Sequence, residues 1–349
     1  MNELRLIFWE TTRACNLECP HCRASAQAQR SPLDLTTEEA KRFINDASSF
    51  SNPILVFSGG EPLLREDIYE LIRFAADLGL KPTLATNATL INEKIAGKLK
   101  DSGVKLISVS IYGGEAQSHD RFCWANGAFN KTLEGIEVIK RSNLPFQINT
   151  TITKTNLAEL EEIGYFALRE GAVAYHIFFL VPTGRGRFMQ GDEISAIEYE
   201  DVFNRLYDFQ VNFPIRIKAT CAPHYHRVLR QRSRLDNRSL AFEGDGFTAH
   251  TKGCLAGQGV CFVSHKGEVF GCGYLPVAAG SVRNQDFKTI WFESELFNTL
   301  RDDSRLEGRC GICEFKKICS GCRARAYAAS GNYLEEEPNC VYQPLTARS

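Results

Sequence analysis

The chemistry available to this chain of 349 residues is set mainly by its thirteen cysteines. Cys15, Cys19 and Cys22 form one tight group with the spacing C-x3-C-x2-C. Three thiolates leave one iron of a 4Fe–4S cube without a protein ligand, and an open coordination position is what a catalytic metal needs. Zinc is the alternative, but its sites usually contain C-x2-C pairs, and no second pair lies nearby.

A second group of eight cysteines lies towards the C-terminal end and could hold two cubes with four thiolates each. Its members are Cys254, Cys261, Cys272, Cys310, Cys313, Cys319, Cys322 and Cys340. Two C-x2-C pairs within this group also suit structural zinc, which stays open as an alternative. Cys123 and Cys221 stand apart from both groups, and Cys221 is readily explained as a buried thiol.

The elements that would position these residues alternate between short apolar strands and amphipathic helices. Such repeats predict an α/β fold with a parallel sheet or barrel, whose chemistry gathers at the C-terminal ends of the strands. The first cysteine group follows the first strand, where this rule expects it. The expected strands are Leu4–Thr11, Ile54–Phe57, Pro82–Thr86, Leu106–Ile111, Phe146–Thr151 and Tyr175–Val181.

Helix signals lie between these strands. Thr36 and Glu39 form a capping-box pattern that opens a helix. Apolar residues recur at helical spacing from Ile68 to Leu78, and Gly79 follows as a stop signal. A later helix is indicated by the spacing of Phe129, Leu133 and Ile136.

The first cysteine group, with Asn16 and His21 inside it, resembles the signature of the radical S-adenosylmethionine (radical SAM) superfamily. In that family the open iron chelates SAM, and one electron from the cluster cleaves SAM to methionine and a 5′-deoxyadenosyl radical. The resemblance implies a partial (β/α)6 TIM-like barrel. It also implies a glycine-rich contact to the methionyl amino group, made by Gly59, Gly60, Glu61 and Pro62.

Three further polar residues are candidates for binding the ribose or carboxylate of SAM. They are Asn87, after the third strand, and Ser108 and Ser110, in the fourth. The family often has different residues beside these positions, where this chain has Ala88 and Tyr112. Capping of the following helices is an equally good account of all three.

The C-terminal cysteines resemble the SPASM extension of radical SAM enzymes, which carries auxiliary 4Fe–4S clusters. The family pairing implies one cluster on Cys254, Cys261, Cys272 and Cys322, and a second on Cys310, Cys313, Cys319 and Cys340. A single auxiliary cluster is the alternative, because the last pair is spaced x2 where the family has x3. The expected organisation is a radical SAM core over 1–213, a basic bridging region over 214–250 and a SPASM-like domain over 251–349.

Nearly the whole chain resembles the heme b synthases of the siroheme-dependent heme pathway. The segments that carry this resemblance are 145–151, 179–186, 220–225 and 271–276. It implies an iron-porphyrin substrate, iron-coproporphyrin III, of which two propionates are decarboxylated to vinyls. Hydrogen would be abstracted from the β-carbon of each propionate, and a ferredoxin or flavodoxin would supply electrons to SAM cleavage.

Candidate substrate residues come from the basic stretches. Arginine pairs with carboxylates bidentately, so Arg185, Arg187, Arg227 and Arg230 are candidate propionate ligands. His224 and His226 are candidate ligands of the porphyrin iron. A solvated helix face and structural histidines are the alternatives for these residues.

Two other functions stay open: a radical SAM/SPASM maturase of a peptide or protein, and a related enzyme of the heme d1 or didecarboxysiroheme pathway. A plain electron carrier would need neither an open iron nor an α/β domain. The net charge of −1 points to no nucleic-acid partner. No apolar run is long enough to span a membrane, and a cytoplasmic location is expected.

Overall fold

The computed structural model describes residues 3–238 and 252–345, and its strands form one ten-stranded sheet in the order β10-β9-β8-β1-β2-β3-β4-β5-β6-β7. All pairs from β8 through β1 to β7 are parallel, and β9 and β10 add antiparallel neighbours at one edge. The strands are β1 Leu6–Glu10, β2 Ile54–Ser58, β3 Lys81–Thr86, β4 Leu106–Ser110, β5 Phe146–Ile152, β6 Ala174–Phe179, β7 Arg216–Thr220, β8 Val260–Val263, β9 Glu268–Phe270 and β10 Ala278–Ser281.

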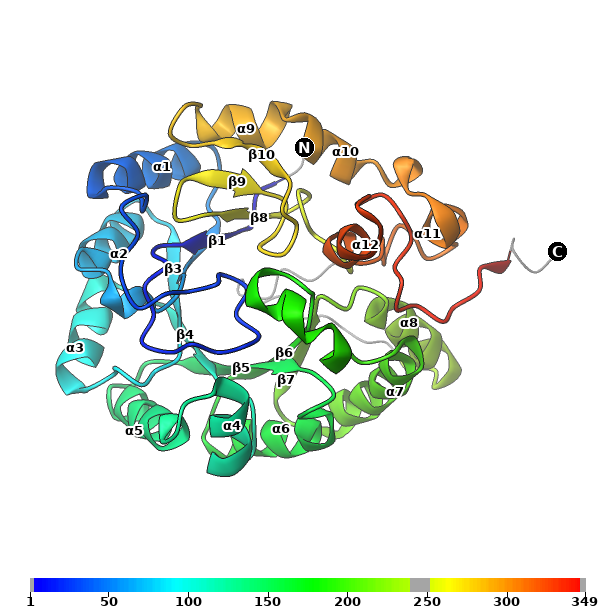
Figure 1. Cartoon of the computed structure of the whole chain (residues 1–349), viewed down its shortest axis with the longest axis horizontal. Helices are drawn as coiled ribbons and strands as arrows, with labels where there is room; N and C mark the ends of the chain where they lie inside the picture. The colour runs from blue at the N-terminus through cyan, green and yellow to red at the C-terminus, as the bar shows by residue number, and fades with distance from the viewer. Residues whose placement is uncertain (1–2, 239–251, 346–349) are drawn as a thin grey trace.

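Helices follow most of the strands and surround them as an outer ring (Figure 1). The α-helices of the described residues are α1 Thr37–Phe50, α2 Ile68–Asp77, α3 Glu93–Ser102, α4 Ala116–Cys123, α5 Ala128–Arg141, α6 Leu160–Arg169, α7 Ala196–Asn212, α8 Tyr225–Leu235, α9 Phe287–Glu293, α10 Glu295–Arg301, α11 Gly308–Ile312 and α12 Arg323–Ser330. Short 3₁₀ turns lie at η1 Pro62–Leu64, η2 Leu157–Glu159, η3 Gly184–Asp192 and η4 Asp303–Arg305.

The α/β prediction is confirmed, and all six expected strands are present as β1 to β6. Local signals act as expected. Thr36 and Glu39 form both bonds of the capping box at α1. Gly79 adopts the left-handed conformation just after α2, with φ +81°. These strands read as apolar runs because helices cover the outside of the sheet.

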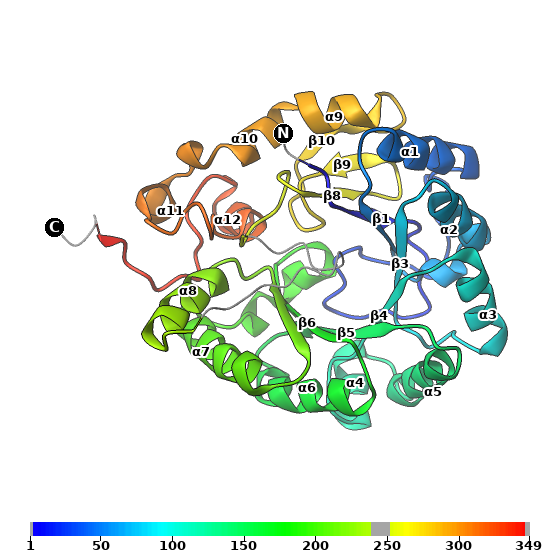
Figure 2. The ribbon, with the colours of Figure 1, turned by 180° about the vertical axis from the view of Figure 1, so that it is seen from behind.

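Two further parallel neighbours extend the six expected strands. β7 pairs with β6, and β8 pairs with β1, so the C-terminal region continues the sheet of the core. Figure 2 shows the same arrangement from behind, with β8 beside β1, α9 near α1, and α11 and α12 near α8. The pairing brings the two cysteine groups to the same barrel-like enclosure.

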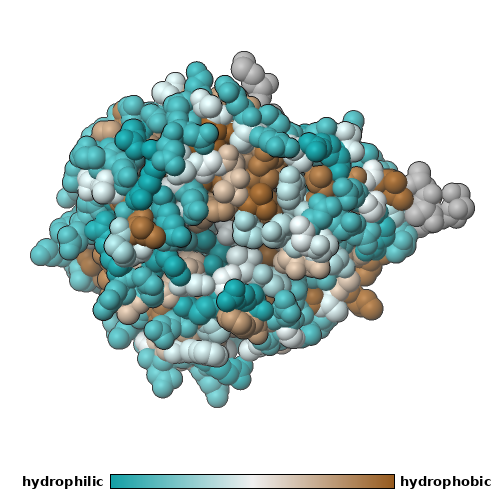
Figure 3. Space-filling view, turned by 45° about the horizontal axis from the view of Figure 1, so that its top comes forward, coloured by the Kyte–Doolittle hydropathy of each residue, from teal (hydrophilic) through white to brown (hydrophobic). Residues whose placement is uncertain are grey.

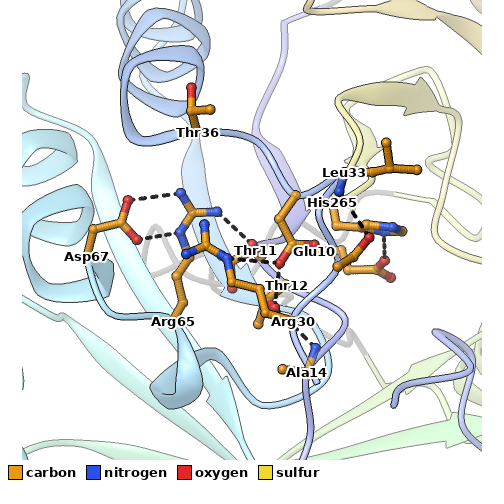
Figure 4. A network of polar contacts seen from close by, with 12 residues as sticks. Glu10, Thr11, Thr12, Ala14, Arg30, Leu33, Thr36, Arg65, Asp67 and His265 are labelled. Carbon is orange, nitrogen blue, oxygen red and sulfur yellow. Dashed lines mark hydrogen bonds and ion pairs between the residues drawn. The ribbon is translucent and has the colours of Figure 1, made fainter. Parts of the chain in front are cut away.

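Buried polar contacts hold the end of β1, where the first cysteine loop begins (Figure 4). Arg65, which is 1% exposed, donates to both carboxylate oxygens of Asp67 and to the carbonyl of Thr11 at 2.7–2.9 Å. Glu10 Oε1 lies 2.6 Å from Nδ1 of His265, a residue of the β8–β9 turn. Because a buried charge is stable only when it is paired, these contacts fix the position of the strand end.

The outer surface is mainly hydrophilic, and Figure 3 shows a group of hydrophobic side chains in a hollow near the centre of one face. None of the helices among residues 3–238 and 252–345 combines the length and apolar character needed to cross a bilayer.

Candidate active site

The first cysteine group lies at the C-terminal end of β1, as the barrel rule expects. Cys15, Cys19 and Cys22 line one cavity of about 200 Å³. Amide N–H groups of Leu17 and Ala26 point at the sulfurs of Cys15 and Cys22, each at 3.4 Å. Three thiols on one wall, with N–H donors aimed at two of them, fit a cluster held by three thiolates.

The electrostatics of this loop differ from one thiol to the next. A hydrogen bond from Cys123 lowers the pKa of Cys19, and the nearby Arg185 guanidinium lowers it further. Burial raises the pKa of Cys15 to about 12. No three His, Cys, Asp or Glu side chains in the described parts of the chain are arranged to hold a single metal ion.

Gly59 and Gly60 are required by the backbone packed against them. Gly59 has φ +151°, and a Cβ there would lie 2.5 Å from the carbonyl oxygen of Thr12. At Gly60 a Cβ would lie 2.1 Å from the carbonyl oxygen of Ala14, to which the amide of Glu61 donates at 2.7 Å. Both glycines therefore let the end of β2 dock directly onto the cysteine loop.

The carboxylate of Glu61 turns inward and holds the loop after β3. It is fully buried and accepts hydrogen bonds from the Thr86 hydroxyl and the Asn87 amide, each at 2.9 Å. Burial raises the pKa of Glu61 to about 7. Pro62, also buried, begins the short turn that follows. Glu61 therefore acts on the cavity indirectly, because it positions Asn87, which lines it.

Asn87 connects this loop to the cysteines. Its Nδ2 donates to Oδ1 of Asn16 at 2.9 Å, and Asn87 lines the same cavity as Cys15, Cys19 and Cys22. The two predicted serines of β4 differ. Ser110 lines the cavity, whereas Ser108 is buried and lies outside its lining. Tyr112, which sequence reasoning treated only as a departure from the family, lines the cavity beside His21, with ring centroids 4.5 Å apart.

A larger cavity of about 290 Å³ adjoins the first inside the barrel. Both cavities are lined by Ser58, Ser110, Tyr112 and Tyr274. One wall of the larger cavity is apolar and is built from inward-facing strand residues. These residues are Leu6, Phe8, Ala85, Val260 and Phe262.

The C-terminal cysteines separate into two groups. Cys254, Cys272 and Cys322 line the larger cavity, together with Cys221. A third cavity, of about 30 Å³, is lined by Cys310, Cys313, Cys319 and Cys340. This second set is the one that the family pairing predicts for one auxiliary cluster.

Cys261, a predicted ligand of the first of these groups, does not line the larger cavity with them. In β8, Val260 and Phe262 face the larger cavity, so the intervening Cys261 faces the opposite side of the sheet. Cys261 is fully buried in the hydrophobic core, and this burial raises the pKa of its thiol. The alternation of side chains along a strand is the physical reason.

The four arginines predicted to bind substrate do not line the larger cavity. Arg185 donates to the carbonyls of Cys19 and Ala26 at 2.9 and 2.5 Å, so it clamps the cysteine loop. Buried Arg227 pairs with Glu200 and lines the third cavity. The side chains of Arg187 and Arg230 are exposed.

The predicted histidines also lie elsewhere. His224 is buried against aromatic rings, lines the third cavity and has its pKa lowered to about 4 by burial. His226 has its pKa lowered to about 4 by burial as well, and it lies outside the larger cavity's lining. The larger cavity is lined instead by His176, whose Nε2 is 2.5 Å from the Thr220 hydroxyl.

Three cationic side chains line the larger cavity: Arg23, Lys218 and Arg323. Arg23 is paired with Glu10 at 2.9 Å, and Arg323 donates to backbone carbonyls of the C-terminal loops. Lys218 forms no hydrogen bond or ion pair with any described residue, and burial alone lowers its pKa to about 8. Lys218 lies in the region 214–250, which the sequence indicates only as basic, and its place beside His176 follows from the pairing of β6 with β7.

Comparisons with known proteins agree with this geometry. Residues 9–166 match the radical SAM superfamily, and residues 254–323 match the SPASM iron–sulfur cluster-binding domain. A solved structure of Streptococcus suis SuiB bound to S-adenosylmethionine superposes with a TM-score of 0.74 at 15% identity, over 98% of this chain and 78% of SuiB. Fold and site together define a radical SAM enzyme with an auxiliary-cluster domain, and its cofactors are SAM and 4Fe–4S clusters.

Its particular family follows from closer relatives. The chain is 52% identical to the AdoMet-dependent heme synthase of Methanosarcina barkeri over 98% of both chains. It is 47% identical to the AdoMet-dependent heme synthase of Nitratidesulfovibrio vulgaris, over 97% of this chain and 93% of the relative. The chain belongs to the AdoMet-dependent heme synthase family.

Proposed function

We propose that this enzyme makes heme b by oxidative decarboxylation of two propionates of iron-coproporphyrin III to vinyls. The observation that carries the proposal is the larger cavity, which lies between the SAM-binding cysteines and the auxiliary cysteines and has an apolar wall. A flat aromatic macrocycle with charged edges suits such a site, because apolar walls bury the ring and a few polar groups orient it.

Lys218 is the proposed anchor of a propionate that does not react. Lys218 lines the cavity and is paired with no anionic side chain among residues 3–238 and 252–345, and burying an isolated charge is costly. A substrate carboxylate would supply the missing partner and form a charge-assisted hydrogen bond. The paired state of Arg23 and the backbone contacts of Arg323 make these two residues weaker candidates.

In the proposed reaction, SAM bound at the first cluster supplies the radical that removes hydrogen from a propionate β-carbon. Gly59 and Gly60 keep the strand end close to the cysteine loop, and Glu61 holds Asn87 at the SAM side. Tyr112 and Tyr274 line both cavities and would define the passage through which SAM and substrate meet. The protein's contribution is to hold the reacting carbon close to the radical and to exclude water.

Electrons must both enter and leave in this scheme. Reductive cleavage of SAM takes one electron for each propionate, and a ferredoxin or flavodoxin is the proposed donor. Each decarboxylation releases one electron from the substrate. The cysteines lining the larger cavity support an acceptor close to that carbon.

The test is mass spectrometry of the anaerobically reconstituted enzyme with iron-coproporphyrin III, SAM and a reductant. The expected product has lost carbon dioxide and two hydrogens from each of two propionates, and the variant with Cys15, Cys19 and Cys22 changed to Ala should form none. Unchanged porphyrin, in a preparation that cleaves SAM and binds the porphyrin, would refute the proposal.

A further inference from the structure

Four cysteines, which lie far apart in the sequence, line the larger cavity. Cys254, Cys272 and Cys322 are the SPASM-type residues of this set, and Cys221 is the fourth. We propose that Cys221 is the fourth thiolate ligand of this auxiliary 4Fe–4S cluster, in the position that the family pairing gives to Cys261.

The surroundings of Cys221 support this assignment. Cys221 lines the same cavity as Cys254, Cys272 and Cys322, and the residues that follow it, Ala222 and Pro223, line that cavity too. These four cysteines together supply the four thiolates that a 4Fe–4S cube usually takes. Cys261 is absent from this lining, because it faces the opposite side of β8.

The backbone supplies a second, independent observation. Cys221 directly follows β7 and has φ +60°, a left-handed conformation that a residue with a Cβ seldom adopts. Residues in such strained conformations persist where the surrounding structure fixes them, and they cluster at functional sites. This turn places Cys221 in the lining of the larger cavity. The preceding residue, Thr220, contacts Nε2 of His176 through its hydroxyl group.

The assignment decides what this cluster can do. Four thiolates saturate all four irons of a cube, so no iron is left for a substrate carboxylate or for water. The cluster would then act only by electron transfer through the cavity wall. With three thiolates the remaining iron could instead bind substrate directly, as at the SAM cluster.

The experiment uses a background in which Cys15, Cys19 and Cys22 are changed to Ala, so that only auxiliary iron is observed. Cys221→Ala is compared with Cys261→Ala, a matched change of another buried thiol. Iron and sulfide are determined after anaerobic reconstitution, and reduced samples are examined by electron paramagnetic resonance.

Cys221→Ala should either lose about four iron atoms per chain or keep them with altered g-values, while Cys261→Ala should match its parent. Parental iron content and spectrum in Cys221→Ala would overturn the inference, as would cluster loss confined to Cys261→Ala.

A second variant separates ligation from folding. Cys221→Gly suits φ +60°, so it removes the thiol without adding backbone strain. Added 2-mercaptoethanol should enter the space left by the side chain and restore the parental spectrum in this variant. A folded Cys221→Gly variant that shows the parental spectrum without added thiol would refute the assignment.

Discussion

Replacing Lys218 by Met gives the sharpest test of how the substrate is held. The side chains have similar length and apolar stems, so the change removes the ammonium and little else. If Lys218 binds a propionate, the variant should bind iron-coproporphyrin III more weakly than the wild-type enzyme. A charge-assisted hydrogen bond contributes about 1.5–3 kcal/mol. Since about 1.4 kcal/mol is a tenfold change, the Kd should rise about 10- to 100-fold.

The same side chain makes an opposite prediction for the enzyme without substrate. Burial lowers the pKa of Lys218 from 10.5 to about 8. The cavity therefore disfavours the ammonium by roughly 3 kcal/mol. Removing this unpaired charge should make the substrate-free protein more stable to denaturant at pH 7, by up to that amount. Weaker porphyrin binding together with greater stability of the substrate-free protein is therefore expected of Lys218→Met if the Lys218 ammonium binds a substrate anion.

The dependence on pH adds a further check. The ammonium loses its proton as pH rises through about 8, so porphyrin affinity should fall over that range. Lys218→Arg keeps its charge at these pH values and should bind the porphyrin without this fall. The assay is an anaerobic absorbance titration with porphyrin, and SAM cleavage without substrate serves as the control. Wild-type affinity in Lys218→Met at pH 7 would refute the assigned role.

Further expectations concern the rest of the site. Arg230→Ala should leave porphyrin affinity within twofold of wild type by the same titration, because the side chain is exposed. Glu61→Gln should remove a decline in stability between about pH 4.5 and 7. Over this range the wild-type unfolded state releases the proton that the folded state retains, as urea unfolding at several pH values would reveal. Joint replacement of Cys15, Cys19 and Cys22 by Ala should abolish 5′-deoxyadenosine formation while auxiliary iron remains, as measured by chromatography and iron analysis.

The strands of the core were accessible from sequence because each is a short apolar run bounded by helix signals. β7 was not, because Arg216 and Lys218 interrupt its apolar character. Its place in the sheet depends on register with His176 in β6, a contact between distant parts of the chain. The pairing of β8 with β1 is equally non-local.

The sequence predicts the parts of the site that lie within one loop. It does not predict the parts that depend on how the strands pair in the sheet. The first cysteine group lies within one loop, so its spacing alone indicated its chemistry. Cys261 was assigned from the family's cysteine pairing, whereas the alternation of side chains along β8 turns it away from the cavity. The propionate ligands were sought in arginine-rich stretches. The structure pairs Arg227 with Glu200, whereas Lys218, which no motif marks, has no ionic partner within the described part of the chain.

In the proposed reaction, the SAM-derived radical removes hydrogen from a propionate of an iron porphyrin bound beside the first cluster. The most direct measurement uses iron-coproporphyrin III deuterated at the β-carbons of its propionates and follows the label into 5′-deoxyadenosine by mass spectrometry. One deuterium should appear in the 5′-deoxyadenosine formed with each vinyl group. Vinyl products accompanied by unlabelled 5′-deoxyadenosine would contradict hydrogen abstraction from the propionate β-carbon by the SAM-derived radical.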